Sequence, residues 1–380
     1  MTIICFKRGA VFRGGPLVIQ DLWIANGKVI PPVETPDIVL DMQDKILSPG
    51  FIDLQLNGGF GIDLTLEPEK LTSLAEKLPS FGVTSFLAAI ISSDRSAYAR
   101  ILSTLRQTSN HYLGAHFLGI HLEGPFLHPS FSGAHPSSCL QALLNMSSIE
   151  EFYGPLDKVK IVTLAPELPL AYEAISMLSS KGIVVSAGHS AASIEQVCEA
   201  KRAGLSMVTH LYNAMIPFSH RAPGLIGAVL SGVIPWYSMI CDGVHVHPAA
   251  VKMAWRANKE GFVLVSDAMS ALGLSSGQYT LGKNSVEVSE AGAILSGTNK
   301  LAGSLVGLDA AVRNLIMMTG CSIPEALAAA TIKPAKILGI EKTKGSLEIG
   351  ADADLVVLNA ELGVEAVYIS GNKATRPSLS

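Results

Sequence analysis

The sequence lacks the long apolar run that a membrane-spanning helix requires. Such a helix needs about 18 or more consecutive apolar residues, and the longest apolar runs here, such as 86–91 and 262–265, have the length of strands. The first 15 residues contain no long apolar segment that would mark a secretory signal. The sequence therefore predicts neither membrane association nor secretion.

Paired cysteine motifs are also missing. The chain has five cysteines, which are scattered and form no CxxC pair. An odd, dispersed set is typical of reduced thiols in a cytoplasmic protein, and it disfavours a zinc site built from cysteine clusters.

Charge of either sign is scarce. Lys and Arg number 28 and Asp and Glu 32, which gives a net charge of −4, and only 16% of residues are charged while 48% are apolar. This composition excludes a disordered chain. It also argues against a nucleic-acid-binding protein, which would usually carry a basic patch.

Strand-like and helix-like segments alternate through the middle of the chain. The strand-like runs are continuously apolar, which is typical of parallel strands covered by helices. We expect eight strands, at 51–56, 83–90, 117–122, 160–164, 183–187, 206–210, 237–241 and 262–266. Helical patterns fall at 69–78, 97–106, 171–179, 194–203 and 248–258. The rhythm predicts an α/β fold with a TIM-like (β/α)8 barrel over residues 49–339, with a doubly wound sheet as the alternative.

No GxGxxG or GxxxxGK[ST] loop follows any of these strands, so a nucleotide-phosphate site has no support. Both ends of the chain carry short β-type runs. They lie at 3–6, 17–19, 22–24 and 38–40, and again at 345–350, 353–358 and 366–369. Neither end makes a core alone, so we expect a small β-sandwich domain built from residues 1–48 and 340–380.

Four ionisable side chains fall where predicted strands end. Glu123 follows the third strand, His189 the fifth and His210 the sixth. In a (β/α)8 barrel these ends meet at the face that carries catalysis. One carboxylate and two imidazoles form a common catalytic zinc set with a position left for water. Asp267, after the eighth strand, would then serve as general base and acid for that water.

A single histidine near a strand end is most often a hydrogen-bonded structural residue, so the argument depends on all four coinciding. His121 should share the side of its strand with Glu123, and it is a candidate to support the site. We expect His111 and His116 to be structural or solvated.

Several segments around these residues resemble N-acetylglucosamine-6-phosphate deacetylases of the amidohydrolase superfamily. They are PGFIDLQLNGG at 49–59, HLEGPF at 121–126, GHS at 188–190, THLYNAM at 209–215, DGVH at 242–245 and SDAM at 266–269. The resemblance covers about 49–335, and both ends fit the family's small β domain. It implies hydrolysis of the N-acetyl group of N-acetyl-D-glucosamine 6-phosphate to D-glucosamine 6-phosphate and acetate.

The resemblance also implies roles for single residues. Glu123, His189 and His210 match the metal ligands. Asp267 matches the general base and acid, and His135 matches the residue at the substrate carbonyl. The substrate-binding positions matched are Ala134, His135, Asn213, Ala214, Arg221, His245, Leu301, Ala302, Gly303 and Ser304. In the family the phosphate contacts matched by Arg221 and His245 can come from a neighbouring subunit, which implies a homodimer.

The first strand departs from the superfamily's usual His-x-His, because it carries Gln55 and Asn57. Neutral amides are weak zinc ligands. These are therefore vestigial second-metal positions, and we expect one divalent metal ion per subunit. Zinc is the first expectation, and Fe2+, Co2+ and Mn2+ are alternatives.

Two other functions stay open. One is a different amidohydrolase, acting on a cyclic amide or on N-acetylgalactosamine 6-phosphate. The other is a barrel that binds a sugar phosphate without catalysis, which Asp267 disfavours, since a binding protein has no evident use for a free carboxylate beside a metal.

Overall fold

The computed structural model describes residues 2–110, 114–142 and 147–375. His111, which we expected to be structural or solvated, lies outside these ranges. So do residues 376–380, the last five of the expected small domain.

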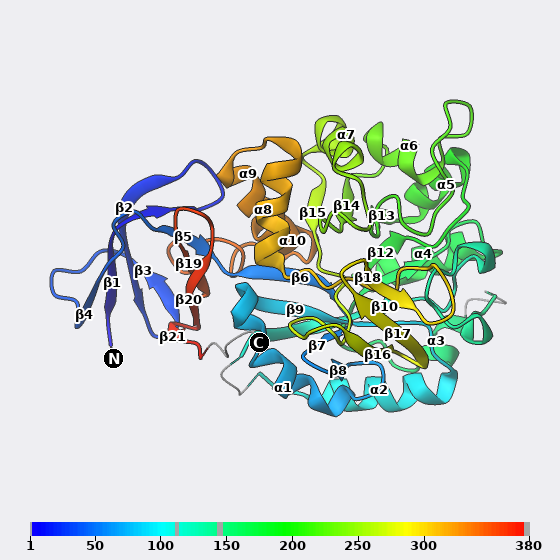
Figure 1. The fold of residues 1–380 in the computed structure, drawn as a ribbon, viewed down its shortest axis with the longest axis horizontal. Helices are drawn as coiled ribbons and strands as arrows, with labels where there is room; N and C mark the ends of the chain where they lie inside the picture. Colours follow the sequence, from blue (N-terminus) through cyan, green and yellow to red (C-terminus); the bar gives the residue numbers. More distant parts are fainter. Residues whose placement is uncertain (1, 111–113, 143–146, 376–380) are drawn as a thin grey trace.

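Eight parallel strands form the centre of the fold (Figure 1). Each strand pairs with the next in chain order: β6 (Phe51–Leu56), β9 (Val83–Ile90), β10 (His116–Glu123), β11 (Val159–Leu164), β12 (Val184–Ala187), β13 (Leu205–Val208), β14 (Trp236–Met239) and β15 (Phe262–Leu264). The segment after β15 returns to β6: Asp267 N donates to Gln55 O at 2.9 Å and Asn57 N donates to Ala268 O at 2.9 Å. These bonds close the ring, so the expected barrel is confirmed and the doubly wound alternative is wrong.

Helices surround the barrel and cover its strands. They are α1 (Leu71–Ala75), α2 (Arg95–Gln107), α3 (Ser147–Tyr153), α4 (Ala171–Ser180), α5 (Ile194–Ala203), α6 (Gly224–Leu230), α7 (Pro248–Asn258), α8 (Leu308–Thr319), α9 (Ile323–Ala330) and α10 (Ile332–Ile337). Short 3-10 turns lie at Pro68–Lys70, Leu78–Phe81, Pro129–Phe131 and Ser137–Cys139. Among the described helices, none is both long and apolar enough to cross a lipid bilayer.

Local sequence sets the ends of these helices. Ser193 caps α5 through a reciprocal pair of hydrogen bonds with Gln196, and Gly204 ends it with a positive φ of 120°, so the predicted limits 194–203 are confirmed. The helix expected at 69–78 is shorter, because Pro79 has no N–H to donate to Ala75 O, which accepts a hydrogen bond from Ala115 N instead. Only α1 with flanking 3-10 turns forms there.

The two ends of the chain share a second sheet. Its strands are β1 (Ile4–Val11), β2 (Val18–Ala25), β3 (Lys28–Ile30), β4 (Ile38–Asp41), β5 (Ile46–Pro49), β19 (Leu355–Leu358), β20 (Val364–Ile369) and β21 (Asn372–Lys373). N-terminal β5 pairs with C-terminal β19 (Figure 1, dark blue beside red). This sheet packs around its own apolar core as the small β-sandwich domain. The domain limits expected at 48 and 340 stay a prediction.

One predicted strand is wrong. Residues 345–350 form no strand, because Gly345 and Gly350 take positive φ values of 75° and 93° that bend the chain. Leu347 between them is nevertheless buried in the core of the small sheet.

A buried ionic cluster joins the small sheet to the start of barrel strand β10. Lys344 Nζ contacts Asp354 Oδ2 and lies 3.0 Å from Asp352 Oδ2, and His116 Nδ1 lies 3.5 Å from Asp354 Oδ2. Burial alone would raise the pKa of Asp354, but the neighbouring His116 and the charge of Lys344 outweigh it and hold that pKa at about 2.

This cluster makes the protein acid-sensitive. Since the unfolded pKa is about 3.9, the carboxylate stabilises the fold fully above pH 4 to 5, and this contribution disappears as pH falls towards 2. We expect Asp354→Asn to lower the free energy of unfolding at pH 7 by about 2–3 kcal/mol, with the difference from wild type shrinking below pH 4. Urea unfolding at pH 7, 4 and 3 measures this, with exposed Asp157→Asn as control. A pH-independent difference would contradict it.

A small hairpin sheet, absent from the sequence prediction, lies between β15 and α8. It contains β16 (Gly277–Leu281), β17 (Asn284–Ser289) and β18 (Gly292–Leu295). A two-stranded piece, β7 (Gly58–Gly59) with β8 (Ile62–Asp63), contacts the turn between β16 and β17, where Gly282 N donates to Asp63 Oδ2 at 2.7 Å. At the β16–β17 turn, Asn284 Nδ2 donates to Ala134 O at 2.7 Å. The hairpin is thus fixed beside the carboxyl ends of the barrel strands.

Candidate metal centre and active site

Three buried side chains meet at the carboxyl ends of β10, β12 and β13. Glu123 Oε1 lies 3.2 Å from His189 Nε2 and 2.9 Å from His210 Nε2, and the two nitrogens lie 3.1 Å apart. Each residue is at most 4% exposed. Among the described residues, these three are the group whose ligand atoms lie close enough together to share a metal ion.

The spacing fits a divalent metal ion. Ligand atoms about 2.0–2.1 Å from a tetrahedral metal lie about 3.3 Å from one another, close to the separations here. His189 Nδ1 donates to Phe131 O at 2.8 Å, so Nε2 of the neutral ring carries a lone pair towards the group. Burial alone would raise the pKa of Glu123, but its close contacts with the His189 and His210 rings outweigh burial and lower that pKa, so the carboxylate is anionic. A carboxylate with two imidazoles suits zinc and similar ions.

Backbone strain concentrates at this place. His189, His210, Tyr212, Ala214 and Asp267 all have positive φ, between 32° and 80°. Residues other than glycine rarely adopt this conformation, and where they do it is often at functional sites. The strain explains why β13 and β15 end two residues before the predicted strands do: the chain must turn there to direct His210 and Asp267 inward.

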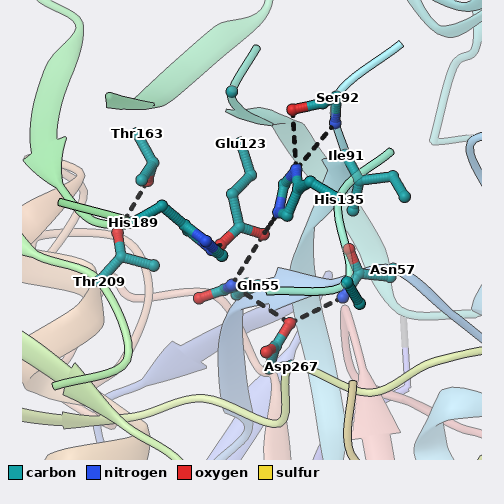
Figure 2. A network of polar contacts seen from close by, with 12 residues as sticks. Gln55, Asn57, Ile91, Ser92, Glu123, His135, Thr163, His189, Thr209 and Asp267 are labelled. Atoms are coloured by element: carbon teal, nitrogen blue, oxygen red, sulfur yellow. Dashed lines mark hydrogen bonds and ion pairs between the residues drawn. The ribbon is translucent and has the colours of Figure 1, made fainter. Parts of the chain in front are cut away.

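Asp267 lies beside the metal group but outside it. Its Oδ1 accepts hydrogen bonds from Asn57 Nδ2 at 2.8 Å and from Gln55 Nε2 at 3.2 Å (Figure 2). Burial, followed by the charge of Glu123, raises the pKa of Asp267 to about 7. A carboxylate with such a pKa can both accept and return a proton near neutrality.

His135 presents a proton donor to the same space. Ser92 N donates to His135 Nδ1 at 3.1 Å and Ser92 Oγ lies 2.8 Å from it (Figure 2), so Nδ1 is the acceptor and Nε2 carries the proton. His135 Nε2 lies 3.9 Å from Glu123 Oε2. Burial, followed by the nearby His189, lowers the pKa of His135 to about 3, so the ring is a neutral donor.

These groups line a cavity of about 330 Å³. The predicted site residues on its wall are Asn57, Glu123, Ala134, His135, His189, His210, Asn213, Ala214, His245, Asp267, Leu301 and Gly303. His245 is oriented by Asp242, whose Oδ2 lies 2.6 Å from His245 Nδ1. The structure thus gathers most of the predicted site in one place.

Four predicted residues do not line this cavity. Gln55 is buried behind it, and Ala302 is buried in the core under the hairpin sheet. Ser304 N donates to Asp267 O at 2.8 Å and so supports the site from behind. Arg221 is exposed on the loop between β13 and α6, away from the cavity of its own chain.

His121 does not join the metal group. Its Nδ1 lies 2.9 Å from Leu54 O and its Nε2 lies 2.8 Å from Thr163 Oγ1. Burial lowers the pKa of His121, which keeps it neutral inside the barrel. It contacts a polar pair in the interior, Thr163 and Thr209, whose hydroxyl oxygens lie 2.7 Å apart (Figure 2).

Sequence reasoning missed six wall residues: Ile91, Gly133, Ile240, Leu281, Asn299 and Lys300. Lys300 could have been predicted from the sequence, because it directly precedes the Leu301–Ser304 loop that matches substrate-binding positions. A tight turn presents it, because Lys300 N donates to Thr298 Oγ1 at 3.1 Å and Leu295 N donates to Lys300 O at 2.8 Å. Among the described residues, its ammonium has no ion-pair partner. Ile91 and Leu281 could not have been predicted, because in a sequence an apolar residue on a cavity wall cannot be distinguished from an apolar residue of the core.

Comparisons with known proteins agree with this site. The family model of the amidohydrolase family matches residues 46–374. The N-acetylglucosamine-6-phosphate deacetylase of Rattus norvegicus is 44% identical, with 97% of this chain and 95% of the relative covered. An N-acetylgalactosamine-6-phosphate deacetylase of Escherichia coli is 34% identical, with 99% and 100% covered.

A solved structure shows the same fold. It is a mutant N-acetyl-D-glucosamine-6-phosphate deacetylase from Mycobacterium smegmatis in complex with N-acetyl-D-glucosamine-6-phosphate. It superposes with a TM-score of 0.89 at 31% identity and covers 98% of this chain and 99% of that one. With a family match over most of its length and these relatives along nearly all of it, the chain belongs to the amidohydrolase family.

Proposed function

We propose that this protein hydrolyses the N-acetyl amide of N-acetyl-D-glucosamine 6-phosphate to D-glucosamine 6-phosphate and acetate. The observation that carries the proposal is the buried Glu123–His189–His210 group with Asp267 left outside it in the same cavity. The deacetylases at about 40% identity along nearly the whole chain support the substrate.

Glu123, His189 and His210 would hold one divalent metal ion, and zinc suits their donor atoms. Such an ion, when bound, would supply Lewis-acid polarisation of the amide carbonyl and make the attacking water more acidic. Gln55 and Asn57 direct N–H groups rather than oxygens towards the neighbouring carboxylates, which supports a single ion per chain.

Asp267 takes a proton from the attacking water and returns it to the leaving nitrogen as the C–N bond breaks. Its raised pKa suits both transfers. His135 Nε2–H donates a hydrogen bond to the carbonyl oxygen as negative charge develops there. The neutral ring, fixed by Ser92, makes this donor available without a protonation step.

The phosphate needs cationic partners, and Lys300 is the lysine on the cavity wall. We expect Lys300→Gln to raise KM for the 6-phosphate about tenfold, a typical loss for one charge-assisted contact, while Lys300→Arg retains most affinity. Hydrolysis of unphosphorylated N-acetylglucosamine should change little. Steady-state kinetics on both sugars measure this, with exposed Lys201→Gln as control. Equal losses on both sugars would contradict a phosphate contact.

Arg221 supports a homodimer. It is exposed and lies away from its own cavity, so we infer that it completes the phosphate site of a second subunit, whereas His245 lines the cavity of its own chain. The cytoplasm is the compartment we infer, because the five cysteines are unpaired.

Acetate release by the purified protein tests the function. Metal content is measured in the same sample, and the substrates are the 6-phosphates of N-acetylglucosamine and N-acetylgalactosamine and the unphosphorylated sugars. Metal-dependent release with the highest kcat/KM on N-acetylglucosamine 6-phosphate is the expected result. A higher kcat/KM on N-acetylgalactosamine 6-phosphate would show that this sugar is the substrate instead. If no acetate is released from any of these sugars, the proposed function is rejected.

A further inference from the structure

Two side-chain amides hold one oxygen of Asp267. Asn57 Nδ2 and Gln55 Nε2 both donate to Oδ1, at 2.8 and 3.2 Å (Figure 2). Among the described residues, no donor reaches Oδ2, and Asp267 lines the cavity. The two oxygens of the carboxylate therefore have different surroundings.

The orientation of both amides is set by carboxylates. Gln55 Nε2 also donates to Glu123 Oε2 at 3.1 Å, so it bridges two acidic groups. If either amide turned over, its carbonyl oxygen would face carboxylate oxygen. In the present orientation Gln55 Oε1 and Asn57 Oδ1 are buried without a partner among the described residues. A buried acceptor without a partner destabilises a protein. The two amides keep this orientation because their N–H groups donate to the carboxylates of Glu123 and Asp267.

The backbone fixes this geometry. Asp267 N donates to Gln55 O at 2.9 Å, Asn57 N donates to Ala268 O at 2.9 Å, and Ser304 N donates to Asp267 O at 2.8 Å. Gln55 and Asn57 are 1% and 2% exposed. The donors and the carboxylate are thus held in register by three main-chain hydrogen bonds, two of which close the barrel.

We propose that Asn57 and Gln55 are positioning residues for Asp267: they hold Oδ1 and leave Oδ2 as the single oxygen that exchanges the proton. This rests on the proposed function, in which the proton leaves water for Oδ2 and passes to nitrogen as the C–N bond breaks. The residues that replace the superfamily's first-strand histidines thereby keep a role without binding a metal ion. Fixing one oxygen removes the need to order the carboxylate during the reaction.

Asn57→Leu and Gln55→Met, which keep the side-chain size and remove the donors, test the proposal. For each we expect kcat for acetate release to fall about 10- to 100-fold, with KM within about threefold and one metal ion per chain. Crystal structures of the metal-loaded wild type and Asn57→Leu should show the Asp267 carboxylate turned or in two orientations in the variant. Asn57→Ala, which also removes the donor, serves if the leucine variant fails to fold, and Asn258→Leu, which removes an amide far from the cavity, is the control.

An unchanged kcat, a KM effect without a kcat effect, or loss of the metal in these variants would overturn the positioning role. If the wild type releases no acetate, the proposed function fails, and the two crystal structures alone decide the inference: an unchanged carboxylate rejects it and a reoriented one supports it.

Discussion

Asp267→Asn is expected to lower kcat for acetate release by about 10³-fold, within the range that general acid–base catalysis contributes. The asparagine keeps the size of the side chain, but it can neither take the proton of water nor deliver one to nitrogen. Because Asp267 lies outside the Glu123–His189–His210 group, metal content should stay at the wild-type level.

Metal analysis, substrate binding by calorimetry and steady-state kinetics check this result together. Asp157→Asn, which removes an exposed carboxylate before β11 at the opposite face of the barrel, is the control and should retain activity. Turnover near the wild-type rate in Asp267→Asn would show that another group is the base.

His210→Ala is expected to lower metal affinity by more than about 100-fold. Even mutation of a residue that only orients a metal ligand typically lowers metal affinity or activity about 10- to 100-fold. Activity should disappear with the metal, because Glu123 and His189 alone leave a two-ligand site. The matched control is His247→Ala, which removes an exposed histidine at the start of α7.

Metal analysis after dialysis against a chelator, followed by stepwise re-addition of Zn2+, measures the affinity of wild type and variant. Wild-type activity should return at about one equivalent of metal. Full metal content in His210→Ala would show that this histidine is not a ligand.

The sequence predicted the barrel well because its strands are buried on both faces. The run Val83–Ile90 is buried at every position and reads as one apolar stretch, so its limits were found. Glu123, His189 and His210 could be grouped without coordinates, since parallel strands in a barrel bring their carboxyl ends to one face.

The hairpin sheet and the orientations of the Gln55 and Asn57 amides depend on contacts between distant residues, which the sequence pattern does not show. The hairpin strand Gly277–Leu281 is mostly exposed and lacks an apolar run, so nothing in its composition marked it. Gln55 and Asn57 could be recognised only as weak metal ligands. Their role as donors follows from the direction of each amide, which two distant carboxylates determine.

The seam where the first and last barrel strands meet has a consequence for how the enzyme loses activity. The main-chain bonds that join residues 55–57 to 267–268 are also the bonds that position Asp267, the proposed proton acceptor. We expect loosening of the ring at this junction to displace Asp267 first, because Glu123, His189 and His210 follow β10, β12 and β13, which are not part of the junction. If partial unfolding begins at the seam, catalytic activity should therefore be lost before the bound metal ion is lost.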